Sequence, residues 1–470
     1  MSSAMTAGIR RSRFRQSGRV LAAASATALV LVGTGCGRSA NDTEVGAGNG
    51  GGSSSSAPAS SSAAPAAGDF GTLKNICGPG DAKGSTARGV TDSTITLGTM
   101  ADAGSTITPG LEIEFFQVGD AFVKWCNAAG GINGRQIKLN KHDAKLFDAG
   151  AQTIQACQTD FMLVGNGSAF DQSTVKPRLA CNLGQIPSYA VSPDATKAGL
   201  QVQPTPNPTT AYPIGAFKAM ARLYPDAKNA IGIGNSNNSS IRPVGLRLRD
   251  ALNGNGFKTV DYQEQPPLVA NWRPYAEEAK TAGVKGFQQI SAQDLTPLIV
   301  AANNVGWKMD FMLENAQFYD PKVVKAANSA KFPDTYIYLN HWPFELADRN
   351  PVVKQAVDIL KASDPSAPKT DFTAMAFSAW ALWAQSATEC GSNLTVNCVL
   401  QKAGAHKDWT AGGLYTARDT DPNNQQQPQC FTLLKLTPGG FVYDEKATQP
   451  NKDIFNCSPD NVVPLSKSYQ

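Results

Sequence analysis

The sequence has few of the residues that metal sites and hydrolytic active sites require. Its 470 residues include only three histidines, which are too few and too scattered for a zinc site. It contains no Cys-x-x-Cys pair and no Gly-x-Ser-x-Gly nucleophile elbow. His142 and Asp143 are neighbours, but they end a predicted strand, which favours an ordinary turn. The sequence therefore predicts a protein that is not an enzyme and that uses no metal or cofactor.

Basic stripes and long apolar runs are also missing after Cys36. The chain has 42 basic and 38 acidic residues, and its net charge falls from +4 to −1 without the five arginines of residues 1–35. With no basic stripe to meet a phosphate backbone, nucleic acid is not an expected partner. A membrane-spanning helix needs roughly 20 apolar residues, and no run after Cys36 qualifies. This argues against a transmembrane receptor.

Residues 1–35 have the pattern of a secretory signal peptide. They contain no Asp, Glu or Lys, and their arginines precede a thirteen-residue apolar run, Val20 to Val32. General secretion is the expected export route, and Arg10-Arg11 leaves the twin-arginine route as the alternative.

The end of this segment, Leu31-Val-Gly-Thr-Gly-Cys36, resembles the bacterial lipobox, with Gly33 where Leu is usual. The resemblance implies that Cys36 is acylated and holds an extracytoplasmic protein on the outer face of the cytoplasmic membrane. The alternative is an ordinary cleaved signal that leaves Cys36 as a free thiol.

Residues 36–75 are predicted to be a lipidated N-terminus followed by a flexible tether. From Gly46 to Gly68 the chain is almost entirely Gly, Ser, Ala and Pro, which bury too little apolar surface to fold. Such a segment has a root-mean-square reach of about 27 Å. The folded body is expected to begin near Ile76.

The cysteines of the body predict disulfides. Eight remain after Cys36, and an even number in an exported chain favours four bridges. Eight cysteines allow roughly a hundred pairings. Short spacing favours Cys390–Cys398 and Cys430–Cys457 as local bridges, and it leaves the partners of Cys77, Cys126, Cys157 and Cys181 open.

The body alternates between predicted strands and helices. The expected strands are 93–98, 137–139, 161–164, 186–189, 230–233, 286–290 and 311–313. The expected helices are 115–126, 149–159, 174–181, 211–223, 242–252, 272–282 and 296–305. This order predicts parallel sheets covered by helices on both faces, and the restart of the pattern after Pro204 predicts two α/β lobes.

Several segments resemble one family. Ile95-Thr-Leu-Gly-Thr-Met100 and Asn127-Ala-Ala-Gly-Gly-Ile-Asn-Gly-Arg135 look like the opening of the leucine/isoleucine/valine-binding proteins, also called type I periplasmic binding proteins. The similarity continues through Phe161-Met-Leu-Val-Gly165 and Trp272-Arg-Pro-Tyr-Ala276. The family includes ABC transporter substrate-binding lipoproteins. The resemblance implies two doubly wound parallel-sheet lobes, joined by three hinge strands, with a small solute held between them.

The resemblance also implies the domain boundaries. Lobe one should comprise residues 76–205 and 338–428, and lobe two residues 206–337 and 429–470. The hinge crossings are expected near 203–207, 336–340 and 427–431. In this fold the implied pairings of the remaining cysteines are Cys157–Cys181 and Cys77–Cys126.

The family places its solute contacts in the loops that follow the strands. Here the resemblance implies hydroxyl contacts from Ser168 and Ser192 and an ammonium partner in Glu314. Other predicted contacts in these loops are Asp102, Phe170, Tyr189, Asn238 and Gln293. The paired hydroxyls of the family are not reproduced. An amino acid is therefore the first expected solute, and an amide, a carboxylate or an aromatic metabolite is the alternative. The implied partner is the permease of an ABC importer, and a ligand-sensing ectodomain is the alternative function.

Overall fold

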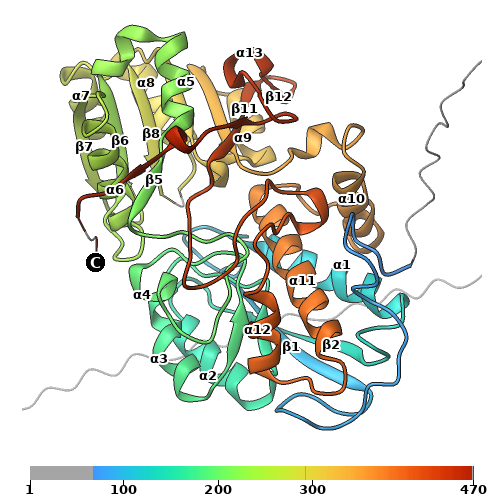
Figure 1. Ribbon diagram of the computed structural model, residues 1–470. Helices are drawn as coiled ribbons and strands as arrows, with labels where there is room; N and C mark the ends of the chain where they lie inside the picture. Colours follow the sequence, from blue (N-terminus) through green and yellow to red (C-terminus); the bar gives the residue numbers. More distant parts are fainter. Residues whose placement is uncertain (1–66, 292, 468, 470) are drawn as a thin grey trace, which may run out of the picture. The chain divides into compact units, whose positions relative to one another are not determined.

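Two separate sheets organise the chain (Figure 1). The computed structural model describes residues 67–291, 293–467 and 469, which fall within one unit of residues 63–470. The first sheet has the order β2-β1-β3-β4, and all its pairs are parallel. Its strands are β1 (Thr94–Ala101), β2 (Gln136–Asp143), β3 (Met162–Val164) and β4 (Gly184–Ile186). This sheet lies at the centre of lobe one.

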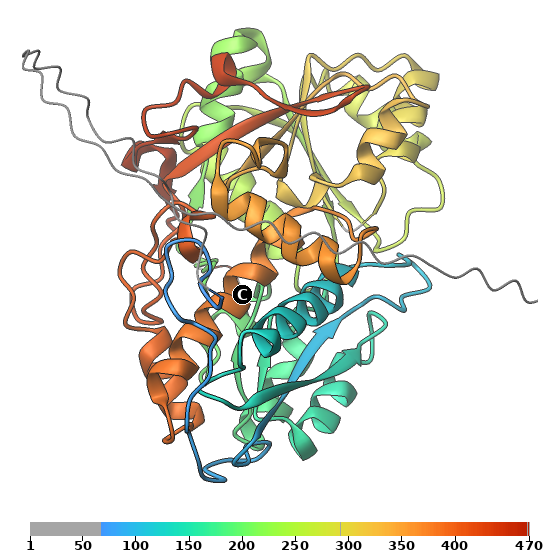
Figure 2. The same cartoon turned by 90° about the vertical axis from the view of Figure 1, so that its right-hand side faces the viewer.

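Helices from two distant parts of the sequence cover the first sheet. The first group follows the strands: α1 (Ile113–Ala128), α2 (Ala149–Thr159), α3 (Gln172–Ala180) and α4 (Pro193–Thr196). The second group comes much later: α10 (Pro351–Ser363), α11 (Asp371–Cys390) and α12 (Val396–Ala403). Figure 2 shows α10 and α11, in orange, beside the teal α1. Trp380 and Trp383 on α11 are fully buried, so this late helix completes the core of lobe one.

The second sheet is larger and mixed. Its order is β12-β11-β10-β9-β8-β6-β7, with β13 paired to β11. Its parallel strands are β6 (Ile231–Ser236), β7 (Thr259–Gln265), β8 (Gly286–Ile290), β9 (Phe311–Glu314) and β10 (Asp334–Leu339). The antiparallel strands are β11 (Cys430–Thr437), β12 (Gly440–Tyr443) and β13 (Asn456–Cys457).

Helices and a short ribbon complete lobe two. The helices are α5 (Gly215–Leu223), α6 (Arg242–Asn253), α7 (Arg273–Thr281), α8 (Thr296–Val305), α9 (Pro321–Ala327) and α13 (Glu445–Thr448). The ribbon pairs β5 (Ala211–Pro213) with β14 (Val462–Pro464). Two doubly wound lobes are thus present, as expected from the sequence.

The chain passes between the lobes three times, and side-chain amides join two of these crossings. The crossings follow α4, follow β10 and precede β11. Gln427 lies in the last of them. Its Nε2 group donates to Pro208 O at 3.1 Å and to Asn207 Oδ1 at 3.3 Å, and both acceptors lie in the first crossing. The first and third crossings are therefore joined to each other by hydrogen bonds.

Proline residues shorten two of the elements predicted from the sequence. The helix expected from Ala211 begins only at Gly215, because Pro213 keeps Tyr212 out of the helical region and residues 211–213 form β5 instead. The strand expected at 186–189 ends at Ile186. Pro187 follows it and has no backbone N–H to continue a sheet ladder.

The part of the chain that the structure describes contains four disulfides, and they are the pairs expected from the sequence. Each joins two cysteines within one lobe. They are Cys77–Cys126, Cys157–Cys181, Cys390–Cys398 and Cys430–Cys457. Across residues 67–291, 293–467 and 469, no helix has the length and hydropathy needed to cross a membrane.

Candidate functional site

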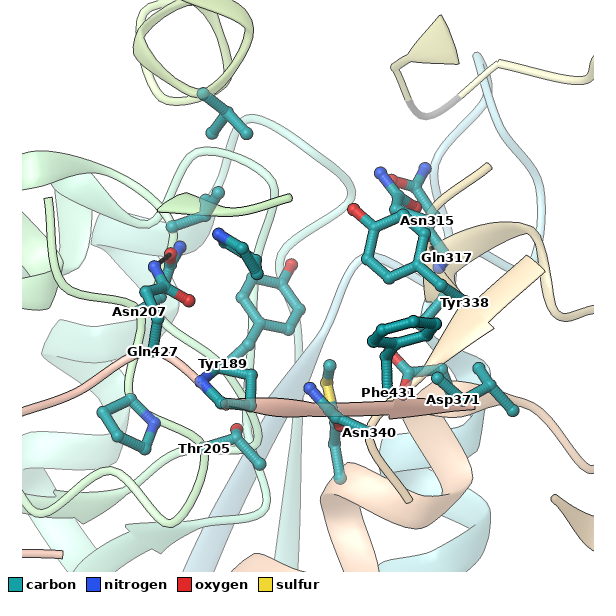
Figure 3. A pocket seen from close by; sticks show the side chains of 18 of the residues that line it. Tyr189, Thr205, Asn207, Asn315, Gln317, Tyr338, Asn340, Asp371, Gln427 and Phe431 are labelled. Carbon is teal, nitrogen blue, oxygen red and sulfur yellow. Dashed lines mark hydrogen bonds between the residues drawn. The ribbon is translucent and has the colours of Figure 1, made fainter. Parts of the chain in front are cut away.

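A cavity of about 300 Å³ lies where the loops of both lobes meet the crossings, and we call it the interlobe cavity. Its wall includes Tyr189, Thr205, Asn315, Tyr338 and Phe431. In Figure 3, Tyr189 and Thr205 lie opposite Asn315, Tyr338 and Phe431 across an open space. The carboxyl ends of parallel strands gather loops at one edge of a sheet, which is why ligands of doubly wound proteins bind there.

Most of the wall is apolar. Lobe one supplies loops and the start of α11, and lobe two supplies helix starts and strand ends. The apolar residues are Leu111, Ala169, Ala190, Val191, Pro206, Pro213, Ala216, Ile241, Val244, Ile290, Ala316, Leu339, Phe372, Met375, Pro428 and Phe431. Such a wall suits a solute with an apolar body, because burying that body removes apolar surface from water.

Glu112 is an unusual polar group in this wall. It precedes α1 in the left-handed conformation, with φ 60°, and it is only 3% exposed. The Tyr189 hydroxyl donates to its Oε1, while Oε2 has no hydrogen-bond partner among the described residues. Burial, and then the negative charge of Asp102, raise the pKa of the Glu112 carboxyl well above its ordinary value. Strained backbone and an unsatisfied buried group together are typical of binding sites.

A second group of charges lies at the start of α11. Asp371 Oδ1 is 3.0 Å from His341 Nε2, and both side chains are buried. Arg418 is also in the wall and is 8% exposed. Its Nη2 donates to Asn340 O at 3.5 Å, and its guanidinium lies 4.6 Å from the centre of the Tyr415 ring. Burial lowers the pKa of this guanidinium.

The sequence predicted eight ligand-contacting residues. Among the described residues that form the wall of the interlobe cavity, Tyr189 is the one that belongs to this set. The other lobe-one residues take part in internal contacts. Ser168 Oγ donates to Asp102 Oδ2 at 3.1 Å, and the Phe170 ring packs against Phe147 with centroids 5.2 Å apart. Ser192 Oγ caps α4 by accepting from Ala195 N at 3.1 Å.

The residues of lobe two that were predicted to contact the ligand also form hydrogen bonds within their own lobe. Asn238 Oδ1 accepts from Ser240 N at 2.8 Å, and Gln293 Oε1 accepts from Val269 N at 2.7 Å. Both carboxyl oxygens of Glu314 lie 3.1 Å from Gln289 N, which donates to them inside the sheet. Burial raises the pKa of Glu314 well above its ordinary value. Glu314 is therefore placed in the interior of lobe two rather than at the cavity.

A second cavity of about 430 Å³ adjoins the first, and we call it the outer cavity. It lies between the loop before α1 and the helix starts of lobe two, and Gln293 is in its wall. The two walls share Leu111, Glu112, Gln317 and Phe372.

Sequence reasoning missed Glu112, Asp371 and Arg418. Glu112 and Asp371 stand just before or at the start of helices, not directly after a strand. Arg418 is in a loop whose backbone pairs with Trp409 by two hydrogen bonds, Trp409 N to Arg418 O at 2.8 Å and Arg418 N to Trp409 O at 3.0 Å. No local pattern in the sequence marks these three as neighbours of the cleft.

Two α/β lobes that enclose a cavity of small-molecule size define a two-lobed binding protein. The sequence profile of the periplasmic binding protein family matches residues 114–440. The chain therefore belongs to the periplasmic binding protein family. No curated protein sequence matches it.

Solved structures share the fold. One is a fatty acid ABC transporter substrate-binding protein from Thermomonospora curvata, with a TM-score of 0.67 and 15% identity, covering 84% of this chain and 99% of that one. Another is a branched-chain amino acid transporter substrate-binding protein from Streptococcus pneumoniae in complex with isoleucine, with a TM-score of 0.60, 15% identity and coverage of 75% and 100%. A leucine-binding protein from Thermotoga maritima has a TM-score of 0.60, 10% identity and coverage of 74% and 97%.

Proposed function

We propose that this chain captures a small organic solute outside the cytoplasm and delivers it to the permease of an ABC importer. The observation that carries the proposal is the interlobe cavity, whose wall is supplied by both lobes. One structural neighbour is a fatty acid ABC transporter substrate-binding protein and another is in complex with isoleucine, and both kinds of solute have apolar bodies. The apolar wall supports a solute of this kind. The proposed role is binding, without catalysis.

The binding mechanism follows from the shared wall. A solute that contacts both lobes binds the closed form more tightly than the open form, and this difference shifts the equilibrium toward closure. We expect a thermal-shift screen of the purified mature protein, with amino acids, amides, carboxylates and aromatic metabolites, to find a stabilising solute. A solute at about 100 times its Kd should stabilise the protein by roughly 2.7 kcal/mol.

Small-angle scattering then tests closure. The radius of gyration should be smaller with the solute than without it. The control is a compound of similar size from the same panel that gives no thermal shift. A bound solute with unchanged scattering would contradict closure of the lobes.

We further propose that Cys36, which lies outside the described residues, is acylated and anchors the protein to the membrane. The support is the lipobox-like sequence that ends at Cys36. Cys36→Ser should move the protein from the membrane fraction to the medium, because the thiol is the site of acylation. Ser39→Ala is the control and should leave fractionation unchanged. Membrane retention of Cys36→Ser would show that another feature is the anchor.

A further inference from the structure

Arg418 is a buried cation that lacks a carboxylate partner. Its side chain is in the wall of the interlobe cavity, with one long hydrogen bond to Asn340 O. Its Nε has no hydrogen-bond partner among the described residues. No carboxylate oxygen of the described chain lies within 4.0 Å of its guanidinium nitrogens, although Asp371 is close enough to influence its pKa. A guanidinium has five N–H donors, so most of the donor capacity of Arg418 is unused.

Two of the other buried arginines make three hydrogen bonds each within the fold, whereas Arg247 makes one and, like Arg178, has no partner for its Nε among the described residues. Arg135 donates to three backbone carbonyls at 3.0–3.1 Å, and Arg178 donates to three at 2.9–3.2 Å. Neither is in the wall of the interlobe or outer cavity. Burying a charge is unfavourable unless hydrogen bonds or an opposite charge compensate it. The partner that Arg418 lacks is therefore expected from a molecule in the cavity.

The two acidic residues in the wall of the interlobe cavity, Glu112 and Asp371, do not supply this partner. Glu112 holds its proton to higher pH than an ordinary carboxyl, because burial, Asp102 and Glu114 all raise its pKa. Its Oε1 already accepts from Tyr189. Asp371 Oδ1 lies 3.0 Å from His341 Nε2 without a hydrogen bond between them, and neither of its carboxyl oxygens is within 4.0 Å of the Arg418 nitrogens. Among the charged groups described in the wall, Arg418 is the cation without a close anion.

The arrangement of the interlobe and outer cavities is a second observation. The interlobe cavity and the outer cavity have Leu111 and Phe372 in common in their walls, so a chain that passes these side chains would reach the outer cavity. The wall of the outer cavity includes the apolar side chains of Val269, Trp272 and Leu295, together with charged residues such as Asp294 and Lys322.

We propose that the solute is an apolar monocarboxylate whose carboxylate pairs with Arg418 and whose chain extends past Phe372 toward the outer cavity. The proposal rests on the proposed function, since it names the solute class of the same cleft. A guanidinium and a carboxylate match in geometry and form two parallel charge-assisted hydrogen bonds. The serine hydroxyls that the family resemblance assigned to the head group of an amino acid are used within lobe one, by Asp102 and by the cap of α4. Arg418 takes the role of head-group receptor instead.

The first test needs no variant. Isothermal titration of the purified mature protein at pH 7.5 compares octanoate with octanamide, octan-1-ol and octylamine, which keep the chain and change the head group, and with leucine. Octanoate should bind at least about 30-fold more tightly than each of them, because only octanoate supplies an anion to a desolvated cation. Lengthening the acid from butanoate to decanoate should strengthen binding as more chain is buried.

Variants then test the residue. Arg418→Gln should weaken octanoate binding at least about 30-fold, and Arg418→Lys should give an intermediate loss, because lysine keeps the charge without the bidentate geometry. Arg88→Gln is the matched control. Arg88 is half-buried in lobe one and donates to Asp160 O at 2.8 Å and to Cys181 O at 3.2 Å, but it is not in the wall of either cavity. Its octanoate affinity should stay within about twofold of wild type.

The outcomes separate this proposal from the proposed function. Uncharged analogues that bind as tightly as octanoate, or Arg418→Gln that binds octanoate like wild type, would overturn the assignment of Arg418. Leucine binding with no octanoate binding would overturn the solute class. After any of these results, closure of the lobes on a different solute would still support the proposed transport function. If Arg418→Gln does not fold, as judged by its thermal unfolding, the head-group series on wild type still decides the proposal.

Discussion

Replacing Arg135 with methionine is expected to lower the free energy of unfolding by about 3–5 kcal/mol, because it removes three charge-assisted hydrogen bonds at once. The Arg135 side chain is fully buried. Its Nε donates to Thr91 O at 3.0 Å, its Nη1 to Gly391 O at 3.1 Å and its Nη2 to Gly84 O at 3.1 Å. Gly84 and Thr91 lie in the segment before β1 and Gly391 follows α11, so one side chain joins two distant segments at the base of lobe one. Urea unfolding of wild type and variant measures the loss.

Two further variants make this result specific. Arg273 is 68% exposed and pairs with Glu277 one helical turn away. Arg273→Met should therefore cost no more than about 0.5 kcal/mol. Arg135→Lys should fall between wild type and Arg135→Met, since an ammonium group cannot reach three carbonyls in the same plane. A loss below about 1 kcal/mol for Arg135→Met would show that water replaces the three donors.

The same residue shows what the sequence could predict. The Ala-Gly-Gly-Ile-Asn-Gly-Arg segment was identified by its resemblance to a family, and the structure gives the physical reason for it. Gly131 has φ +79°, and a Cβ atom at this position would lie 2.1 Å from Arg135 O. The glycine thus allows the tight turn that directs Arg135 into the base of the lobe. The motif marks a structural support, and it carries no information about the solute.

Elements with clear apolar periodicity or clear boundaries were predictable. Helices α2 and α8 and strand β8 have the bounds expected from the sequence. Strand β7 was not predicted, because its sequence from Thr259 to Gln265 is polar. Several of its buried polar groups pair with neighbours: Gln263 Nε2 donates to Asp261 Oδ2 at 2.7 Å and to Tyr275 O at 2.8 Å. A strand stabilised by such a network has no hydrophobic pattern to recognise.

The candidate site was predictable only at the level of loops. The sequence correctly indicated which loops converge, but it could not show which side chains are already used within a lobe. Ser192 illustrates this. It precedes Pro193, and Ser followed by Pro is a signal for the start of a helix, so its role as the cap of α4 could have been found. Arg418 could not have been found, because its place beside the cavity depends on a contact with Asn340 O, far away in the sequence at the second crossing.

A buried acid next to the outer cavity should make the stability of the protein depend on pH. Glu114 is 4% exposed, accepts from Thr370 Oγ1 at 2.9 Å, and burial raises its pKa to about 7. In the unfolded chain a glutamate has a pKa of about 4.3. Below both pKa values the Glu114 carboxyl is protonated in the folded and in the unfolded protein. As the pH rises from about 4.5 to 7, the unfolded state releases its proton first, so the folded state loses stability. This one group should account for a loss of about 3 kcal/mol between pH 4.5 and pH 8.

Glu114→Gln tests the direction and the size of this pH dependence of stability, because glutamine keeps an oxygen that accepts from Thr370 and cannot ionise. Urea unfolding of wild type and variant at pH 4.5 and pH 8 should show a fall in stability that is smaller by about 3 kcal/mol in the variant. Glu277→Gln, on the exposed face of α7, removes a carboxyl from the surface and should leave the wild-type pH dependence nearly unchanged. Equal pH dependence in wild type and Glu114→Gln would mean that Glu114 is ionised in the folded protein near pH 5, with water reaching it through the outer cavity.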